Sequence, residues 1–166
     1  GGDSSSLGGV YKLSGIEKDG EIVAKIKISN DPRKINNPGY KQVFRLYDKD
    51  NGMALADLIT LDDESIDESA PLEIFHPLYT YKRKILTNFS AYKLLHPVFR
   101  EGKFVGVRRT VSEIARFSKE QKSKFWLEHL RNVHPQSYKV DLSQKLWDIR
   151  KSLINECNLN LKEKYV

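Results

Sequence analysis

The stretch Lys25–Arg45, KIKISNDPRKINNPGYKQVFR, holds six cations and a single acid, Asp31. Its opening residues alternate polar and apolar side chains, which predicts a half-buried strand over Lys25–Ser29 with both lysines on one face. Asn37–Gly39 breaks the chain, and Val43–Tyr47 is typical of a second strand. A basic loop between two strands gathers cations around one point, which suits phosphate or pyrophosphate. The alternative is an exposed edge strand blunted by solvated lysines.

Length and composition narrow the class of protein. The chain has 166 residues, 39% of them hydrophobic, enough for one domain or two small subdomains. It has neither a long apolar run that would span a membrane nor a signal-peptide pattern, so a cytoplasmic location is the default expectation. The single Cys157 excludes an internal disulfide and a multi-cysteine metal site. The net charge of +6 is spread along the chain and permits nucleic acid or anionic metabolites as partners.

The first part of the chain is rich in hairpin signals. Gly1–Ser6 is typical of a loop, and a first strand is predicted over Gly9–Ile16. Asp19-Gly20 and Asn51-Gly52 are strong turn signals that supply positive φ angles. They predict two hairpins, one joining Val10–Ser14 to Ile22–Ile28 and one joining Val43–Tyr47 to Met53–Leu61. The acidic run that follows lacks calcium-loop spacing, so residues 62–70 are interpreted as a solvated linker.

The second part changes from strands to helices. Short strands are predicted over Pro71–Pro77 and Phe104–Val107, the latter after a turn at Glu101–Lys103. A capping box at Thr110–Glu113 predicts a helix that runs to about Arg131. Another at Asp141–Gln144, with apolar residues at helical spacing, predicts a helix from Leu142 to about Asn155.

This order of elements predicts an α+β fold, with antiparallel hairpins in the first half and helices in the last third. We expect a hairpin-rich basic region over residues 1–61, the acidic linker over 62–70, and a mixed region over 71–166 that ends in two amphipathic helices. The chain has no nucleophile elbow, zinc-protease, Walker or dinucleotide motif. Its histidines, three of which precede prolines, are expected in loops without a catalytic or metal role: His76, His96, His129 and His134.

Several segments, in order, resemble the C-terminal part of nicotinate phosphoribosyltransferase. They cover nearly the whole chain: Leu7–Leu13, Lys25–Ser29, Pro32–Lys34, Pro38–Lys41, Arg45–Asp48, Glu73–Pro77, Lys82–Lys84 and Tyr138–Leu146. The resemblance implies a type II phosphoribosyltransferase fold, of which this chain would be about the last third, starting just past a glycine-rich phosphate loop. The family couples nicotinate to phosphoribosyl pyrophosphate, assisted by ATP with magnesium, usually as a homodimer.

In that family the phosphorylated histidine and the nicotinate-holding arginine lie upstream. The resemblance therefore implies that this chain has no catalytic residue and no metal site, and that it is inactive alone. Sister enzymes acting on nicotinamide use matching cations to line a polyphosphate channel. By that resemblance the channel residues here are Lys12, Lys27, Lys34 and Arg45.

Three alternatives stay open at this point. The chain could be a stand-alone basic module for nucleic acid, although it shows no aromatic pair or recognition helix of the usual kinds. It could be purely structural. Arg45 in particular could pair across its hairpin with an acid such as Asp57 instead of contacting phosphate.

Overall fold

The computed structural model describes residues 9–163, so the predicted loop at Gly1–Ser6 and the Leu7-Gly8 part of the resemblance lie outside the described residues. The chain divides into two compact units. The sheet unit is Lys41–Trp147, and the loop unit holds the residues up to Tyr40 and those from Asp148 onward. Each unit is described by itself below.

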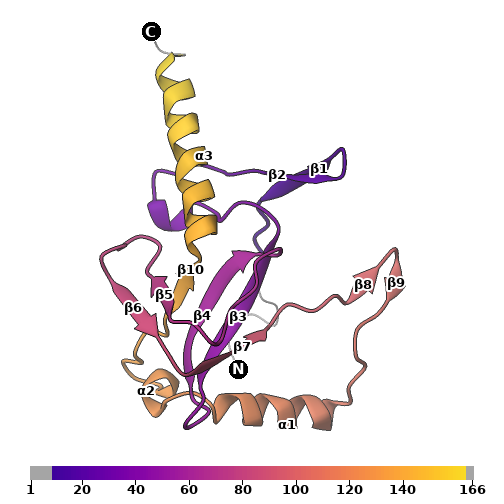
Figure 1. Cartoon of the computed structure of the whole chain (residues 1–166). Helices are drawn as coiled ribbons and strands as arrows, with labels where there is room; N and C mark the ends of the chain where they lie inside the picture. The colour runs from indigo at the N-terminus through magenta and orange to yellow at the C-terminus, as the bar shows by residue number, and fades with distance from the viewer. Residues whose placement is uncertain (1–8, 164–166) are drawn as a thin grey trace. The chain divides into compact units, whose positions relative to one another are not determined.

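The sheet unit is built on a six-stranded sheet in the order β6-β5-β10-β4-β3-β7, visible in Figure 1. All neighbouring strands pair antiparallel except β10 and β4, which are parallel. This confirms the α+β class. The strands are β3 (Lys41–Asp48), β4 (Ala54–Leu61), β5 (Leu72–Phe75), β6 (Arg83–Leu86), β7 (Phe89–Lys93) and β10 (Val140–Leu142).

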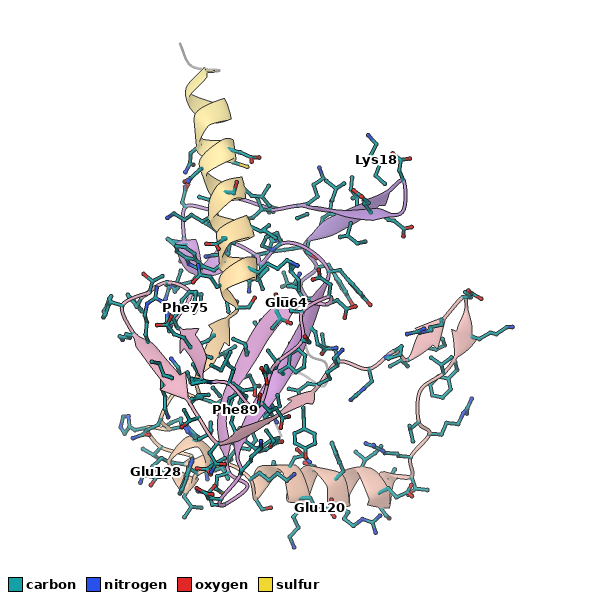
Figure 2. All side chains as sticks on the ribbon, in the orientation of Figure 1. Lys18, Glu64, Phe75, Phe89, Glu120 and Glu128 are labelled. Carbon is teal, nitrogen blue, oxygen red and sulfur yellow. The ribbon has the colours of Figure 1, made fainter. Side chains whose placement is uncertain are left out.

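One face of this sheet carries the hydrophobic core. Alternate residues of β3 are buried, as expected when side chains of a strand point to opposite faces. Phe89 is fully buried, and Figure 2 shows it among the crowded side chains over the sheet. The buried cluster is made of Phe44, Leu46, Ala56, Leu58, Ile74, Leu86 and Phe89.

The predicted hairpin between β3 and β4 is confirmed. Gly52 takes φ 70°, a conformation that glycine adopts without steric cost. Asn51 does not have a positive φ. Its side-chain oxygen instead accepts a hydrogen bond from Met53 N at 2.8 Å. The strand predicted at Pro71–Pro77 is also confirmed as β5, and Phe89–Lys93 forms the edge strand β7.

The first predicted helix is real but shorter than expected. α1 spans Val111–Lys122, and its capping box is complete, with Glu113 N bonded to the Thr110 hydroxyl and Thr110 N to the Glu113 carboxylate. The prediction that it runs to Arg131 is wrong. Ala54 N donates to the Lys124 carbonyl at 2.7 Å, so the chain after α1 is tied to β4. α2 (Leu127–Leu130) follows separately.

The second predicted helix begins later than expected. Leu142 belongs to β10, between β4 and β5, where it is almost completely buried. α3 spans Gln144–Glu163, and the cap is Ser143, whose hydroxyl accepts from Leu146 N at 3.2 Å. Pairing with two strands far away in sequence outweighs the local helical pattern at Leu142.

The loop unit contains the hairpin of β1 (Gly15–Lys18) and β2 (Glu21–Ala24), with Asp19 and Gly20 both at positive φ as predicted. A short 3-10 turn, η1, follows at Pro32–Lys34. Two strand predictions are wrong. Strand structure starts at Gly15 rather than Gly9, and Lys25–Ser29 is irregular because β2 ends at Ala24.

A small hairpin lies between β7 and α1. It consists of β8 (Phe99–Arg100) and β9 (Lys103–Phe104), so the strand predicted over Phe104–Val107 reduces to its first residue. The turn predicted between the two strands is confirmed, with Glu101 and Gly102 at positive φ. None of the helices in the described part of the chain is both long and apolar enough to cross a bilayer.

Candidate functional site

The basic loop of the loop unit is organised by the side chain of Asn36. Its oxygen accepts from Lys27 N at 2.7 Å, while its amide nitrogen donates to the carbonyls of Leu13 at 3.2 Å and Lys25 at 3.4 Å. An amide can do this because it carries both acceptor and donors. Asn36 therefore connects two separate segments of the chain. It also accepts the hydrogen bond of the Lys27 N–H, so this group does not pair with a neighbouring strand.

A second contact brings two of the predicted phosphate-binding lysines together. Lys12 Nζ donates to the main-chain carbonyl of Lys34, which ends η1. This turn is capped by Asp31, whose carboxylate accepts from Arg33 N and from the Arg33 guanidinium. The Arg33 hydrogen bonds lower the pKa of Asp31. The acid of the basic loop is thus committed to Arg33, not to the lysines.

The result is a set of three exposed lysines held by defined contacts: Lys27 and Lys34 through their backbones and Lys12 through its ammonium group. Lys12 contacts Lys34 directly, and Lys27 is connected through Asn36 to Leu13, the neighbour of Lys12. Lysine side chains act as strongly hydrated point charges that can converge on an anion. The arrangement can hold a group such as phosphate, but it offers no nucleophile or general base.

Arg45 lies in the sheet unit and has a different environment. Its Nε and Nη2 donate to the two carboxylate oxygens of Asp57, both at 2.8 Å, across the β3–β4 pair. The side chains are 18% and 12% exposed. The Arg45 guanidinium also lies over the Phe125 ring at 4.8 Å. The cross-hairpin pair weighed as an alternative is present, and a phosphate contact by Arg45 stays a prediction.

Tyr138 completes this cluster. Its hydroxyl donates to Asp57 Oδ1 at 3.1 Å, and its ring meets Phe125 edge-on with centroids 5.0 Å apart. Burial and the negative charge of Asp57 raise the pKa of the Tyr138 hydroxyl. The hydrogen bond with Asp57 likewise raises the pKa of Arg45. Both groups therefore keep their protons at any physiological pH, so this cluster is fixed and not a proton-transfer site.

Sequence reasoning missed two residues near the basic loop. Asn36 gave no signal because an asparagine in a turn-rich loop has many roles. Arg150 is 7% exposed and donates through Nη2 to the Pro32 carbonyl at 3.4 Å. Burial lowers the pKa of this guanidinium. Its position four residues after the buried Leu146, on the same helical face, was the available signal.

His76 and two acids of the acidic run have structural partners. His76 Nδ1 accepts from Leu78 N and Tyr79 N, both at 3.1 Å. Glu64 accepts from Leu61 N and the Ser143 hydroxyl, and Asp63 pairs with Lys145 at 2.6 Å. Within residues 9–163, no cluster of three or more histidine, cysteine or acidic side chains is placed to hold a metal ion.

Comparison with known proteins gives a consistent result. Residues 40–150 match the family model described as the nicotinate phosphoribosyltransferase C-terminal domain. The chain is 36% identical to nicotinate phosphoribosyltransferase of Bacillus subtilis, with 97% of this chain and 33% of that protein aligned. It is 33% identical to the Dictyostelium discoideum enzyme, over 86% of this chain and 25% of that protein.

The fold agrees with a solved structure. The crystal structure of human nicotinic acid phosphoribosyltransferase superposes with a TM-score of 0.64 at 25% identity, covering 70% of this chain and 23% of the human chain. The chain therefore belongs to the nicotinate phosphoribosyltransferase C-terminal domain family. It spans about a third or less of the length of these relatives.

The Asn36 contacts generate a first prediction. Asn36→Leu keeps the approximate size but removes all three hydrogen bonds and leaves Lys27 N and two carbonyls without this partner. We expect amide exchange at Lys27 to accelerate and the loop unit to lose about 1–3 kcal/mol of local stability. Hydrogen-exchange mass spectrometry measures both. Asn30→Leu, at an exposed position of the same loop, is the control. Unchanged protection at Lys27 would contradict the role assigned to Asn36.

The Arg45–Asp57 pair generates a second prediction. Asp57→Ala leaves a guanidinium largely buried without its partner and should lower the free energy of unfolding by about 3 kcal/mol. The double variant Arg45→Met/Asp57→Leu should recover most of that loss. The control is the pair of Arg83 and Glu73, whose side chains are 44% and 48% exposed; Glu73→Ala should cost under about 1 kcal/mol. Denaturant unfolding gives the values, and equal costs for the two acids would refute the distinction.

Proposed function

We propose that this chain is the C-terminal part of a nicotinate phosphoribosyltransferase. The parent enzyme converts nicotinate and phosphoribosyl pyrophosphate, with ATP, to nicotinate mononucleotide and pyrophosphate in NAD biosynthesis. The observation that carries the proposal is the family match over residues 40–150. This part of the enzyme contributes phosphate-binding cations, and the reacting groups belong to other parts.

The physical argument concerns the three lysines of the loop unit. Phosphoryl transfer and pyrophosphate release develop charge on crowded oxygens, and fixed cations stabilise that charge. Lys12, Lys27 and Lys34 are exposed. The Lys27 backbone is positioned by Asn36, and the Lys12 ammonium donates to the Lys34 carbonyl. We assign the polyphosphate contact chiefly to these lysines.

Arg45 has a different role from the three lysines. Two of its nitrogens already bond Asp57, and breaking that pair would leave an unpaired carboxylate in a largely buried position. We infer that the main role of Arg45 is to stabilise the fold of the sheet unit. If it also meets polyphosphate, it does so without leaving Asp57, through the remaining Nη1.

The proposal extends to properties of the whole enzyme. These are a type II phosphoribosyltransferase fold, assistance by ATP, a homodimer, a cytoplasmic location and inactivity of this chain alone. Magnesium would accompany the nucleotide or pyrophosphate.

The test uses the full-length enzyme that carries this sequence. Lys34→Ala should raise the Michaelis constant for phosphoribosyl pyrophosphate or ATP by about tenfold, equivalent to one charge-assisted contact. The constant for nicotinate should not change, and Lys34→Arg should restore part of the loss. Lys84→Ala, an exposed position on β6, is the matched control.

Two results would contradict the proposal. One is that Lys34→Ala has the same Michaelis constants as the Lys84→Ala control. The other is turnover by the 166-residue chain alone, which would contradict the division of labour between this chain and the rest of the enzyme. A melting curve on Arg45→Ala beside its kinetics tests the separate role of that residue, since lowered stability with unchanged kinetics is the expected result.

A further inference from the structure

The sheet unit contains a cavity that has no role in the proposed function. Its volume is about 510 Å³, within the range of small-molecule sites. It lies between the edge strand β7 and α1. Its lining residues are Tyr47, Tyr92, Lys93, Leu94, His96, Arg109, Phe117, Gln121 and Lys124.

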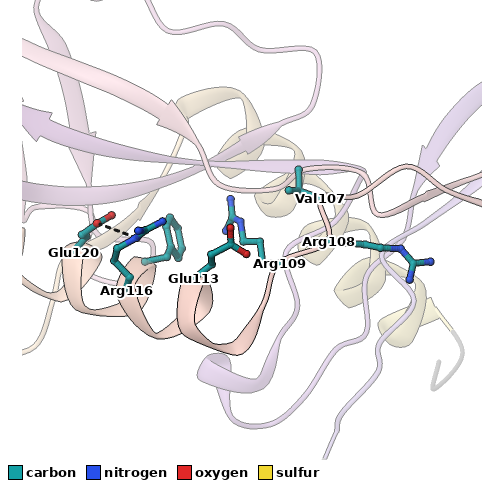
Figure 3. Close-up of a pocket in the computed structure, with 7 residues that line it drawn as sticks. Val107, Arg108, Arg109, Glu113, Arg116 and Glu120 are labelled. Atoms are coloured by element: carbon teal, nitrogen blue, oxygen red, sulfur yellow. Dashed lines mark ion pairs between the residues drawn. The ribbon is translucent and has the colours of Figure 1, made fainter.

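The charge of this cavity is one-sided. The ionisable lining residues other than tyrosine are all basic: Lys93, His96, Arg109 and Lys124. None of the described lining residues is acidic. The cavity beside it differs. That smaller space, about 260 Å³, is lined by arginines and also by Glu113 and Glu120. Figure 3 shows Arg116 directed at Glu120, with which it pairs at 3.9 Å. Arg109 lines both cavities and interacts with Glu113 of the smaller one. The larger cavity itself has cations and no acid among its described lining residues, so it favours an anion.

The cations of the larger cavity stand against aromatic rings. Lys124 Nζ lies 4.9 Å from the centre of the Tyr47 ring, and Arg109 lies 4.8 Å from that of Phe117. Cation–π contacts of this kind restrict where the charges lie. The Tyr47 hydroxyl also donates to Gln121 at 3.2 Å, which fixes α1 against β3. Lys124 and Arg109 are therefore held at the wall of the cavity and do not simply extend into solvent.

One ring is available to a ligand. Tyr92 meets Tyr47 edge-on, with centroids 5.5 Å apart, but remains 60% exposed, whereas Tyr47 is buried. An exposed ring beside cations suits a planar aromatic group attached to an anion. Stacking on such a ring does not depend on the identity of the base.

We propose that this cavity binds a mononucleotide, with its phosphate at Lys124 and Arg109 and its base against Tyr92. Lys93 takes no part, because its ammonium lies over the Phe44 ring at 5.8 Å, on the face of β7 opposite to Tyr92. A mononucleotide is favoured over a nucleic acid strand because the cations and the open ring surround one bounded cavity. The site lies in the sheet unit, whereas the proposed polyphosphate lysines lie in the loop unit, so different substitutions test the two.

The experiment is calorimetric titration of the 166-residue chain with adenosine monophosphate, adenosine and ribose 5-phosphate. Lys124→Ala should weaken binding of the two phosphorylated probes by about tenfold and leave adenosine unchanged. Tyr92→Leu should weaken adenosine monophosphate and adenosine and leave ribose 5-phosphate unchanged. The controls are Lys84→Ala and Lys34→Ala for charge and Tyr81→Leu, at an exposed ring outside the cavity. Circular dichroism melting of each variant confirms folding.

The opposite outcomes are equally definite. The proposal is wrong if the folded chain binds none of the probes at millimolar concentration, in which case the cavity is a surface for packing against other protein. It is also wrong if Lys34→Ala and not Lys124→Ala weakens the nucleotide, or if a single-stranded oligonucleotide binds far more tightly than the mononucleotide.

Discussion

The sheet unit depends on the bidentate ion pair between Arg45 of β3 and Asp57 of β4. Four parts of the chain meet at this pair, because Tyr138 donates to Asp57 and Phe125 lies against the guanidinium. A largely buried ion pair overcomes its desolvation cost only if the remaining donors and acceptors are also satisfied. The hydroxyl and the aromatic ring help to meet this requirement, and they hold the segments after α1 and before β10 in place.

This constraint explains the position of α1. The helix has no buried residue among those described, so packing of an apolar face does not hold it. It is held at its C-terminal end, where the Lys124 carbonyl accepts from Ala54 N and Phe125 reaches Arg45. Figure 1 shows α1 ending near the turn between β3 and β4. The nucleotide cavity arises because α1 is tied at that end and lies beside the edge of β7.

Local features of the fold could be predicted from the sequence because local chemistry decides them. Gly20 and Gly52 take the positive φ angles that their turns need, and Thr110 caps α1 with Glu113. Long-range features could not. β10 looked helical because the capping pattern at Asp141 is local, whereas its pairing with β4 joins residues far apart in the sequence. The role of Asn36 could not be predicted for the same reason, since two of its partners lie in segments that only the folded chain brings near it.

We propose that the lysines of the loop unit bind anions and that Arg45 chiefly stabilises the sheet unit. Titration of the isotopically labelled chain with pyrophosphate, followed by NMR of backbone amides, tests this most directly. We expect saturable chemical-shift changes around Lys12, Lys27 and Lys34 that are lost in Asn36→Leu, with the Arg45 amide unchanged. Saturable shifts centred on Arg45 and Asp57, with none in the basic loop, would contradict it.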